Sequence, residues 1–279
     1  MKPLYQHKPV LIIGGNGKTG RRVANKLAER NIPFRAVSRS SSTRFDWNDD
    51  STWAAALEGA GAAYITYQPD LAVPGAVETT QAFTEAALKH GVSRLVLLSG
   101  RGEEEAQRAE HVLQQSAAEW TIVRASWFAQ NFSESFLMDG ILAGHVTLPA
   151  HSAKEPFIDT NDIADVVVAA LMDPAHVGKL YEVTGPRLIS FAEAVAEIGS
   201  ATGRDITYQQ LPAEQYAAFA KSHGVPDDMI SLVMYLFTTV LDGRNEYVCG
   251  GIEEALGRPP TDFNAYAKNV AASGIWKGQ

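Results

Sequence analysis

The sequence predicts an α/β fold built on a doubly wound parallel sheet, with a smaller, mostly helical C-terminal part. Short runs rich in β-branched and apolar residues alternate with helical segments along the first half of the chain, which is typical of βαβ units and a parallel sheet. The first of these runs, residues 10–13, leads directly into a glycine-rich turn that opens a helix. Right-handed crossovers between such units place helices on both faces of the sheet.

Five strands of this sheet are expected in the first half of the chain, each a short apolar run that suits a strand buried on both faces. They lie at residues 10–13, 34–38, 62–66, 94–98 and 120–124. Three helices are expected between them, at residues 18–30, 74–90 and 103–118. Val23 and Leu27 lie one turn apart on one face of the first helix, and Pro74 and Gly91 mark the start and the end of the second.

The pattern changes after about residue 130, where helices dominate. Short strands are expected at residues 157–158, 180–183 and 206–209, and helices at 162–172, 190–201, 213–222, 227–241 and 262–272. Thr160 and Asn161 are the candidate caps of the helix at 162–172, because their side chains accept hydrogen bonds from free backbone N–H groups. We expect a first domain at residues 1–150, with sheet contributions from 155–185. A mostly helical lobe at 186–279 then packs on it without a linker.

Composition and charge narrow the class of protein. The chain has 279 residues, of which 46% are hydrophobic and 20% charged, and this excludes a disordered or collagen-like protein. The net charge of −8 argues against general nucleic-acid binding, but residues 1–44 hold ten basic residues and one acid. This basic segment indicates a small anionic ligand or, alternatively, a solvated helix face. We expect no transmembrane helix, no signal peptide and, with Cys249 as the only cysteine, a cytoplasmic protein.

The strongest motif is the glycine-rich turn Gly14-Gly15-Asn16-Gly17-Lys18-Thr19-Gly20. In dinucleotide-binding folds the first of three spaced glycines permits a tight turn, the second admits a pyrophosphate, and the third lets the helix pack on the strand. Free N–H groups at the helix start then attract the phosphates. A phosphate loop of ATPases is excluded, because Ile12 stands where that motif requires glycine. The turn therefore predicts dinucleotide binding, with a purely structural glycine turn as the alternative.

The second strand ends at Ser38-Arg39-Ser40-Ser41-Ser42. An NAD-binding fold usually places an acidic residue here to bind the ribose 2′-hydroxyl, but no acid stands between residues 33 and 42. Arg39 and the serines instead suit a 2′-phosphate, so NADP(H) is favoured over NAD(H). The alternative is an exposed arginine that binds no ligand.

Further segments follow these two motifs in an order that carries a resemblance. They are Phe45-Asp46-Trp47, Leu97-Leu98-Ser99 and Trp127-Phe128-Ala129-Gln130-Asn131-Phe132. With residues 14–20 and 38–40, they resemble the NmrA-like branch of the atypical short-chain dehydrogenases, and most nearly its festuclavine/agroclavine dehydrogenase group. The resemblance covers nearly the whole chain and implies a Rossmann-type domain that binds NADP(H), followed by a small substrate lobe.

The resemblance also implies which residues bind the cofactor. The glycine-rich turn and the strand end would contribute Gly14, Asn16, Gly17, Lys18, Thr19, Gly20, Ser38, Arg39 and Ser40. Further along the chain, Asp46 and Trp47 would lie beside the adenine, Tyr67 and Gln68 under the cofactor, and Ser99 and Gly100 near the nicotinamide. For Tyr67, simple packing is an equal alternative.

The chain departs from typical short-chain dehydrogenases at their catalytic pair. Their Tyr-x-x-x-Lys positions fall on Gly102 and Ala106 here, so no catalytic residue is assigned. Two classes of function fit this loss. One is a reductase that transfers hydride to a small, largely apolar acceptor of the iminium, quinone or enone type. The other is a non-catalytic NADP(H)-sensing regulatory protein that binds a protein partner. We favour the reductase.

The candidate substrate contacts are Trp127, Phe128, Asn131 and Phe132, because they supply aromatic surface and one amide just after the last strand of the first half. Their alternatives are core packing for the rings and a hydrogen bond at a helix start for the amide. The histidines show no metal-ligand spacing, so we expect no metal site. We also expect no direct contact with nucleic acid or a membrane.

Overall fold

The computed structural model describes residues 8–150 and 152–277. The chain divides into two compact units. Unit 1 comprises Met1–Ala125, Thr160–Val183 and Gly250–Arg258, and unit 2 comprises Ser126–Asp159, Thr184–Cys249 and Pro259–Gln279. These bounds differ from a division near residue 150, because residues 126–150 group with unit 2 and residues 250–258 with unit 1.

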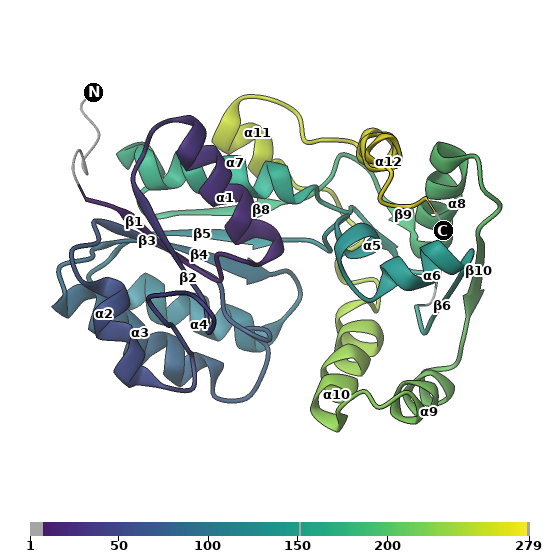
Figure 1. The fold of residues 1–279 in the computed structure, drawn as a ribbon, viewed down its shortest axis with the longest axis horizontal. Coiled ribbons are helices and arrows are strands. Elements are labelled where there is room, and N and C mark those ends of the chain that lie inside the picture. Colours follow the sequence, from purple (N-terminus) through teal and green to yellow (C-terminus); the bar gives the residue numbers. More distant parts are fainter. Residues whose placement is uncertain (1–7, 151, 278–279) are drawn as a thin grey trace. The chain divides into compact units, whose positions relative to one another are not determined.

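Unit 1 is built on a six-stranded parallel sheet (Figure 1). In spatial order its strands are β2 (Phe34–Val37), β1 (Val10–Ile13), β3 (Ala62–Ile65), β4 (Arg94–Gly100), β5 (Glu119–Ala125) and β8 (Lys179–Val183). One face carries α1 (Lys18–Glu29), α7 (Thr160–Met172) and α11 (Gly251–Leu256). The other carries α2 (Trp53–Leu57), α3 (Ala76–Lys89) and α4 (Glu104–Gln115). The predicted α/β, doubly wound parallel fold is confirmed.

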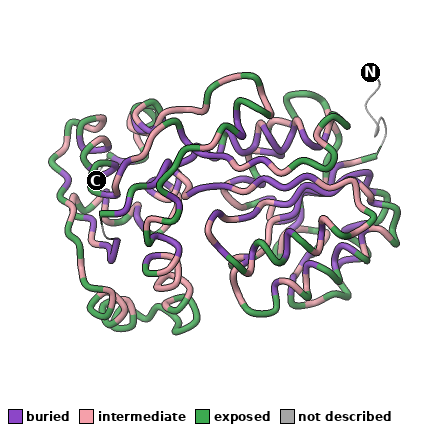
Figure 2. Tube along the Cα trace, turned by 180° about the vertical axis from the view of Figure 1, so that it is seen from behind, coloured by how far each residue is buried: buried purple, intermediate pink, exposed green. Residues whose placement is uncertain are grey.

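The strand sequences explain why the sheet lies in the interior of unit 1. Every residue of β1 and of β3 is buried, and the strands are buried in Figure 2 wherever helices cover both faces. Alternate side chains therefore enter the cores on opposite faces. Leu11 and Ile13 belong to the core that Leu57, Phe83 and Leu113 complete from the helices α2, α3 and α4.

The strand order sets the position of a ligand site. From β1 the chain passes first to β2 on one side and then to β3 on the other, so the connections diverge between β1 and β3. In open α/β sheets ligands bind at such a switch point, beyond the carboxyl ends of the strands. We call the edge where β1, β2, β3 and β4 end the carboxyl edge of unit 1.

Unit 2 is mostly helical, with two short strand pairs. Its helices are α5 (Asn131–Glu134), α6 (Leu137–Ala143), α8 (Phe191–Thr202), α9 (Ala213–Ser222), α10 (Asp227–Tyr235) and α12 (Phe263–Ser273), and a π-helical segment, η3 (Leu236–Val240), follows α10. Strand β6 (His145–Leu148) pairs with β10 (Thr207–Gln210), and β7 (Lys154–Glu155) pairs with β9 (Ile189–Ser190). Its core gathers the aromatic rings of Phe132, Phe157, Phe191, Phe263 and Trp276.

Most predicted elements are present within a few residues of their expected bounds, but three predictions were wrong. Residues 157–158 form no strand, because Ile158 makes only an isolated bridge to Phe128. Neither Thr160 nor Asn161 caps α7, since the helix begins at Thr160. The helix expected at 227–241 gives way to the π-helical segment at Leu236. Several short elements were not predicted, among them α2, α5, α6, α11, β6, β7, β9 and the 3₁₀ turns η1 (Asp50–Thr52) and η2 (Pro174–His176).

Candidate functional site

The glycine-rich turn joins β1 to α1 at the carboxyl edge of unit 1. The N–H groups of Gly14 and Gly15 both donate to the Val37 carbonyl, at N···O distances of 3.0 and 3.1 Å, so the end of β2 fixes the turn. Gly17 precedes α1 without a side-chain cap, and the first turn of the helix holds no acidic residue. The helix therefore presents free N–H groups and the positive end of its dipole to an anion.

Three of the four glycines in the turn are required by the protein's own packing. Gly14 has a φ of +71°, a conformation that other residues rarely adopt. A Cβ at Gly15 would lie 2.6 Å from the Ala36 Cβ, and one at Gly20 would lie 2.2 Å from the Gly14 carbonyl oxygen. At Gly17 a Cβ would meet only that same oxygen, at 3.1 Å. The bare backbone at Gly17 thus leaves space beside the helix start, which suits a bound phosphate.

The other predicted residues of the turn differ in which of their groups a ligand could contact. Asn16 is exposed and its Nδ2 donates to the Ser38 hydroxyl at 3.2 Å. Thr19 is 4% exposed, so α1 offers a ligand its backbone N–H rather than its side chain. The Lys18 carbonyl accepts a hydrogen bond from the Arg22 guanidinium at 2.7 Å.

The serine-rich turn after β2 is ordered by its own hydroxyl groups. The Ser41 hydroxyl donates to the Thr43 carbonyl at 2.6 Å and accepts from the Ser38 N–H at 2.8 Å. The Ser40 N–H donates to the Ser38 hydroxyl at 3.3 Å. Arg39 is exposed and, among the described residues, makes no hydrogen bond or ion pair. Its guanidinium is therefore free to bind an anion at this end of β2.

Asp46 and Trp47 occupy different environments although they are neighbours. The Asn48 N–H and the Arg44 guanidinium donate to the Asp46 carboxylate, at 3.1 and 2.9 Å, and lower its pKa. Trp47 is 9% exposed, and its ring lies 4.8 Å from that of Tyr67, centroid to centroid. Trp47 thus packs in an aromatic core and offers little surface to an adenine, whereas the Asp46 side chain is 15% exposed.

The end of β4 carries an unpaired polar group. Ser99 is 5% exposed, and its hydroxyl has no hydrogen-bond partner within the part of the chain that the structure describes. Leaving a buried hydroxyl unpaired is unfavourable. The Ser99 hydroxyl therefore indicates a polar group of a ligand at the carboxyl edge, and the residues there fit a dinucleotide.

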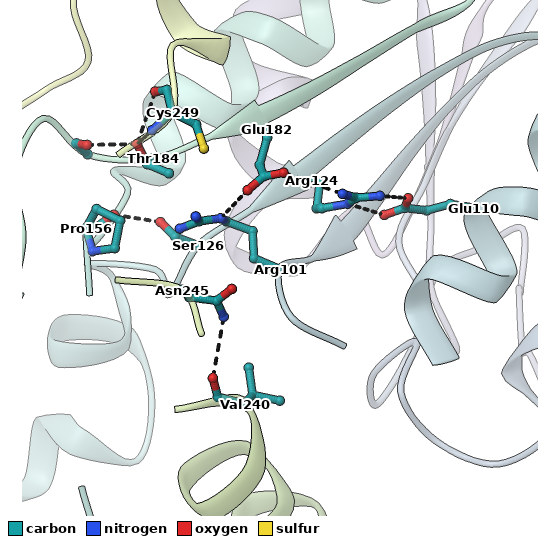
Figure 3. Close-up of polar contacts among 11 residues, drawn as sticks. Arg101, Glu110, Arg124, Ser126, Pro156, Glu182, Thr184, Val240, Asn245 and Cys249 are labelled. Atoms are coloured by element: carbon teal, nitrogen blue, oxygen red, sulfur yellow. Dashed lines mark hydrogen bonds and ion pairs between the residues drawn. The ribbon is translucent and has the colours of Figure 1, made fainter. Parts of the chain in front are cut away.

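An ion-pair network that was not predicted lies beside this strand end (Figure 3). The Arg101 side chain is 1% exposed and its Nε donates to Glu182 at 2.8 Å. Arg124 also reaches Glu182, at 3.4 Å, and binds both carboxylate oxygens of Glu110. Hydrogen bonding to Glu110 raises the pKa of Arg124. The network joins Arg101, directly after β4, to β5, β8 and α4, so Arg101 and Arg124 have structural partners.

A pair of carboxyl groups was also not predicted. Asp70, in the segment after β3, lies near Glu103, which directly precedes α4, and its charge acts on that carboxyl group. Glu103 is 7% exposed, and its carboxylate fills the space where Gly100 has no side chain, since a Cβ there would lie 2.3 Å from the Glu103 Oε1. Burial and the neighbouring Asp70 carboxylate raise the pKa of Glu103 well above its usual value.

Gly102 and Ala106 stand where typical short-chain dehydrogenases have their catalytic tyrosine and lysine. Neither residue has a side chain that could donate or accept a proton. Gly102 has a φ of +73° in the turn before α4, and Ala106 is fully buried within α4.

The predicted substrate residues lie in unit 2, and one of them was wrong. Phe132 is fully buried, and its ring lies 5.4 Å from that of Phe157, so it belongs to the core and offers no surface to a substrate. Trp127 is half-buried against the ring of Phe237, at 4.9 Å. Phe128 is half-buried, as is Asn131, which begins α5.

Sequence reasoning passed over Gln130, in the middle of that segment. Its Nε2 donates to the Asp159 carboxylate at 2.7 Å, and both side chains are buried. A glutamine between hydrophobic residues could have suggested a buried side chain that needs a hydrogen-bond partner. Within residues 8–150 and 152–277 no three His, Cys, Asp or Glu residues are grouped to hold a metal ion. No described helix is long and apolar enough to cross a membrane.

The switch point, the uncapped start of α1 and the glycine-rich turn define a dinucleotide-binding protein of the Rossmann type. The family model described as NAD(P)H-binding matches residues 14–174, more than half of the chain, and the chain belongs to this family. With relatives named as an agroclavine dehydrogenase and an NAD(P)H azoreductase along nearly its whole length, it is an NAD(P)H-dependent oxidoreductase.

Known proteins resemble the chain over nearly its whole length. Agroclavine dehydrogenase of Claviceps fusiformis is 31% identical, over 94% of this chain and 98% of its own. NAD(P)H azoreductase of Xenophilus azovorans is 27% identical, over 95% of this chain and 98% of its own. The fold is shared with NADPH-dependent quinone oxidoreductase from Escherichia coli, solved with NADPH, at a TM-score of 0.78 and 20% identity over 94% of this chain and 99% of that one. The resemblance to the clavine dehydrogenases is confirmed.

Proposed function

We propose that the chain is an NADPH-dependent reductase that transfers hydride to a small, largely apolar acceptor of the iminium, quinone or enone type, without a Tyr–Lys pair. The observation that carries the proposal is the carboxyl edge of unit 1. It combines the uncapped start of α1, the free guanidinium of Arg39 and the unpaired hydroxyl of Ser99. Relatives named agroclavine dehydrogenase and NAD(P)H azoreductase support a reductase of small molecules.

NADPH is favoured over NADH by the end of β2. Arg39 is exposed and uses none of its donors within the described residues, and the neighbouring hydroxyl groups of Ser38 and Ser40 add further donors. A guanidinium can bind a phosphate through two parallel hydrogen bonds. In this proposal Arg39 binds the 2′-phosphate, and the backbone around Gly17 binds the pyrophosphate.

The cofactor supplies the hydride, and the protein supplies binding and orientation. Ser99 would hold the nicotinamide end by satisfying its own buried hydroxyl. Trp127, Phe128 and Asn131 are the proposed substrate contacts, with aromatic surface for an apolar body and one amide for orientation. An iminium becomes a neutral amine on gaining hydride alone, so this acceptor makes no demand for a tyrosine acid at Gly102.

The proposal is tested by incubating the protein with NADPH and a panel of iminium salts, quinones, enones and azo dyes, and following the loss of cofactor absorbance. Turnover of at least one class is the expected result. The proposal fails if bound NADPH is never oxidised while a protein partner binds differently with and without the cofactor. A sensor of NADP(H) would then replace it.

A further inference from the structure

The switch point at the carboxyl edge of unit 1 lies where β1 and β3 separate. The two strands are in register at Val10, Leu11 and Ile12, and their pairing ends before Ile13. On its other side, β1 remains paired with β2 as far as Ile13 and Val37. The Ile13 carbonyl, directly before the glycine-rich turn, therefore lies beyond the last residue of β1 that pairs with β3.

A threonine hydroxyl connects the two strand ends at this point. Thr66 directly follows β3, and its hydroxyl donates a hydrogen bond to the Ile13 carbonyl at 2.9 Å. The same oxygen fills the space beside Gly14, since a Cβ there would lie 2.3 Å from the Thr66 Oγ1. The hydroxyl thus holds the end of β3 against the start of the turn, and it contacts the glycine whose φ of +71° sets the direction of that turn.

Trp47 holds the backbone of Thr66. Its indole Nε1 donates to the Thr66 backbone carbonyl at 3.0 Å. The indole packs against buried rings, with centroid distances of 4.9 Å to Phe45 and 5.2 Å to Phe83, so its position is determined by the core of unit 1. A buried indole N–H requires a partner, and here that partner is the residue that contacts the glycine-rich turn. Trp47 therefore restrains Thr66, although it offers little surface to an adenine.

The contacts of Thr66 reach the backbone that is expected to bind the pyrophosphate. The Gly17 N–H donates to the Gly14 carbonyl at 2.8 Å, so the position of Gly14 determines that of Gly17 and of the start of α1. Backbone N–H groups that are already oriented bind an anion more tightly than groups that must first be ordered. A contact that fixes Gly14 therefore favours phosphate binding without touching the phosphate.

We propose that Thr66 and Trp47 are positioning residues of the cofactor site; this rests on the proposed function, which places the pyrophosphate at Gly17. The Thr66 hydroxyl holds Ile13 and Gly14 in the conformation that binds the pyrophosphate, and Trp47 holds Thr66. Both residues lie outside the glycine-rich turn in the sequence. Their contribution is a lower free-energy cost of ordering the turn when the cofactor binds.

Thr66→Val tests the hydroxyl, because valine keeps the shape of the side chain and places a methyl group against the Ile13 carbonyl. Calorimetry should show an NADPH affinity lower by about two- to tenfold, the range for one hydrogen bond between uncharged groups. Thr66→Ser retains the hydroxyl and should recover most of this loss. Thr84→Val is the matched control, because the Thr84 hydroxyl also donates to a backbone carbonyl, that of Thr80 at 2.8 Å within α3. It should leave the NADPH affinity unchanged, whatever its Tm.

Trp47→Phe tests the second contact, because phenylalanine keeps an aromatic ring in the core and removes the N–H donor. Alone, it should lower the NADPH affinity by less than Thr66→Val does. Combined with Thr66→Val it should cause no further loss, because Trp47 acts on the turn only through Thr66. Direct contact between Trp47 and the cofactor would instead make the two losses multiply, as independent effects do.

The outcomes that overturn the proposal are distinguishable. Unchanged affinity in Thr66→Val, while Gly17→Val abolishes binding, refutes the positioning role and leaves the proposed function intact. An equal loss of affinity in Thr66→Val, Thr66→Ser and Thr84→Val shows that lower stability, and not the hydroxyl, weakens binding. Losses that multiply in the double variant refute the action of Trp47 through Thr66. A Gly17→Val variant that binds NADPH as tightly as the wild type refutes the placement of the pyrophosphate, and with it the proposed cofactor site itself.

Discussion

Replacing Arg39 with alanine should weaken NADPH binding and leave NADH binding nearly unchanged. Arg39 makes no hydrogen bond or ion pair within the described residues, so its removal breaks no interaction of the protein itself. Any loss of affinity then reports on the 2′-phosphate, which NADPH carries and NADH lacks.

The magnitude follows from the exposure of the guanidinium. Hydrogen bonds to charged groups contribute about 1.5–3 kcal/mol. Because Arg39 is exposed and must be ordered on binding, we expect the lower half of this range, about 1.5–2 kcal/mol. That corresponds to an NADPH affinity lower by about ten- to thirtyfold, and the loss should shrink at high salt.

Isothermal titration calorimetry with NADPH and NADH on each protein measures this directly. Arg44→Ala is the matched control, because the Arg44 guanidinium is already bound to Asp46 at 2.9 Å and lies 3.6 Å from Asp49. It should change the preference for NADPH less than twofold. Equal affinity of the wild type for the two cofactors would refute the reasoning, as would an equal loss for both in Arg39→Ala.

Three further predictions concern the glycine-rich turn, the carboxyl pair and unit 2. Gly17→Val should abolish cofactor binding, measured by calorimetry, and leave the circular dichroism spectrum unchanged. Gly15→Val should instead lower Tm, because its side chain would collide with β2. A folded Gly17→Val variant that still binds NADPH would contradict this prediction. The raised pKa of Glu103 stabilises the folded protein at acidic pH, and this contribution is lost as the pH rises through that pKa, by about 1.4 kcal/mol per unit of pKa shift. Glu103→Gln should therefore raise Tm relative to the wild type increasingly as the pH rises above the ordinary glutamate pKa, and parallel Tm curves would argue against a raised pKa of Glu103. Trp127→Ala and Asn131→Ala should each lower kcat/KM by about ten- to a hundredfold with little change in NADPH affinity; unchanged turnover would place the substrate elsewhere.

The parts of unit 1 that the sequence predicts are those determined by local pattern. β1 is recognisable in the sequence as a short apolar run. The bounds of α1 follow from Gly17 and from the spacing of Val23 and Leu27. The glycine-rich turn was recognisable because its backbone conformation and close packing both require glycine at fixed spacings. The backbone conformation of this turn is therefore encoded within a short stretch of chain.

The features that were missed depend on contacts between distant segments. The sequence around Asp70 does not indicate that Glu103 lies near it. The two residues are close because β3 and β4 are neighbouring strands of the sheet. An aspartate just after one strand and a glutamate just after the next strand along the chain is a signal that could have suggested the pair. The packing of Phe132 was harder to foresee, since an aromatic residue after a strand suits a core and a pocket equally well.

The discontinuity of unit 1 governs when the nascent chain can fold. Its sheet is incomplete when β5 leaves the ribosome, because the neighbouring strand β8 is Lys179–Val183 and α11 follows only at Gly251–Leu256. Until β8 emerges, β5 presents an open strand edge, which is prone to pair with other chains. Expression of residues 1–150 alone would make that transient state permanent, so a shortened cofactor domain should aggregate where the full chain folds.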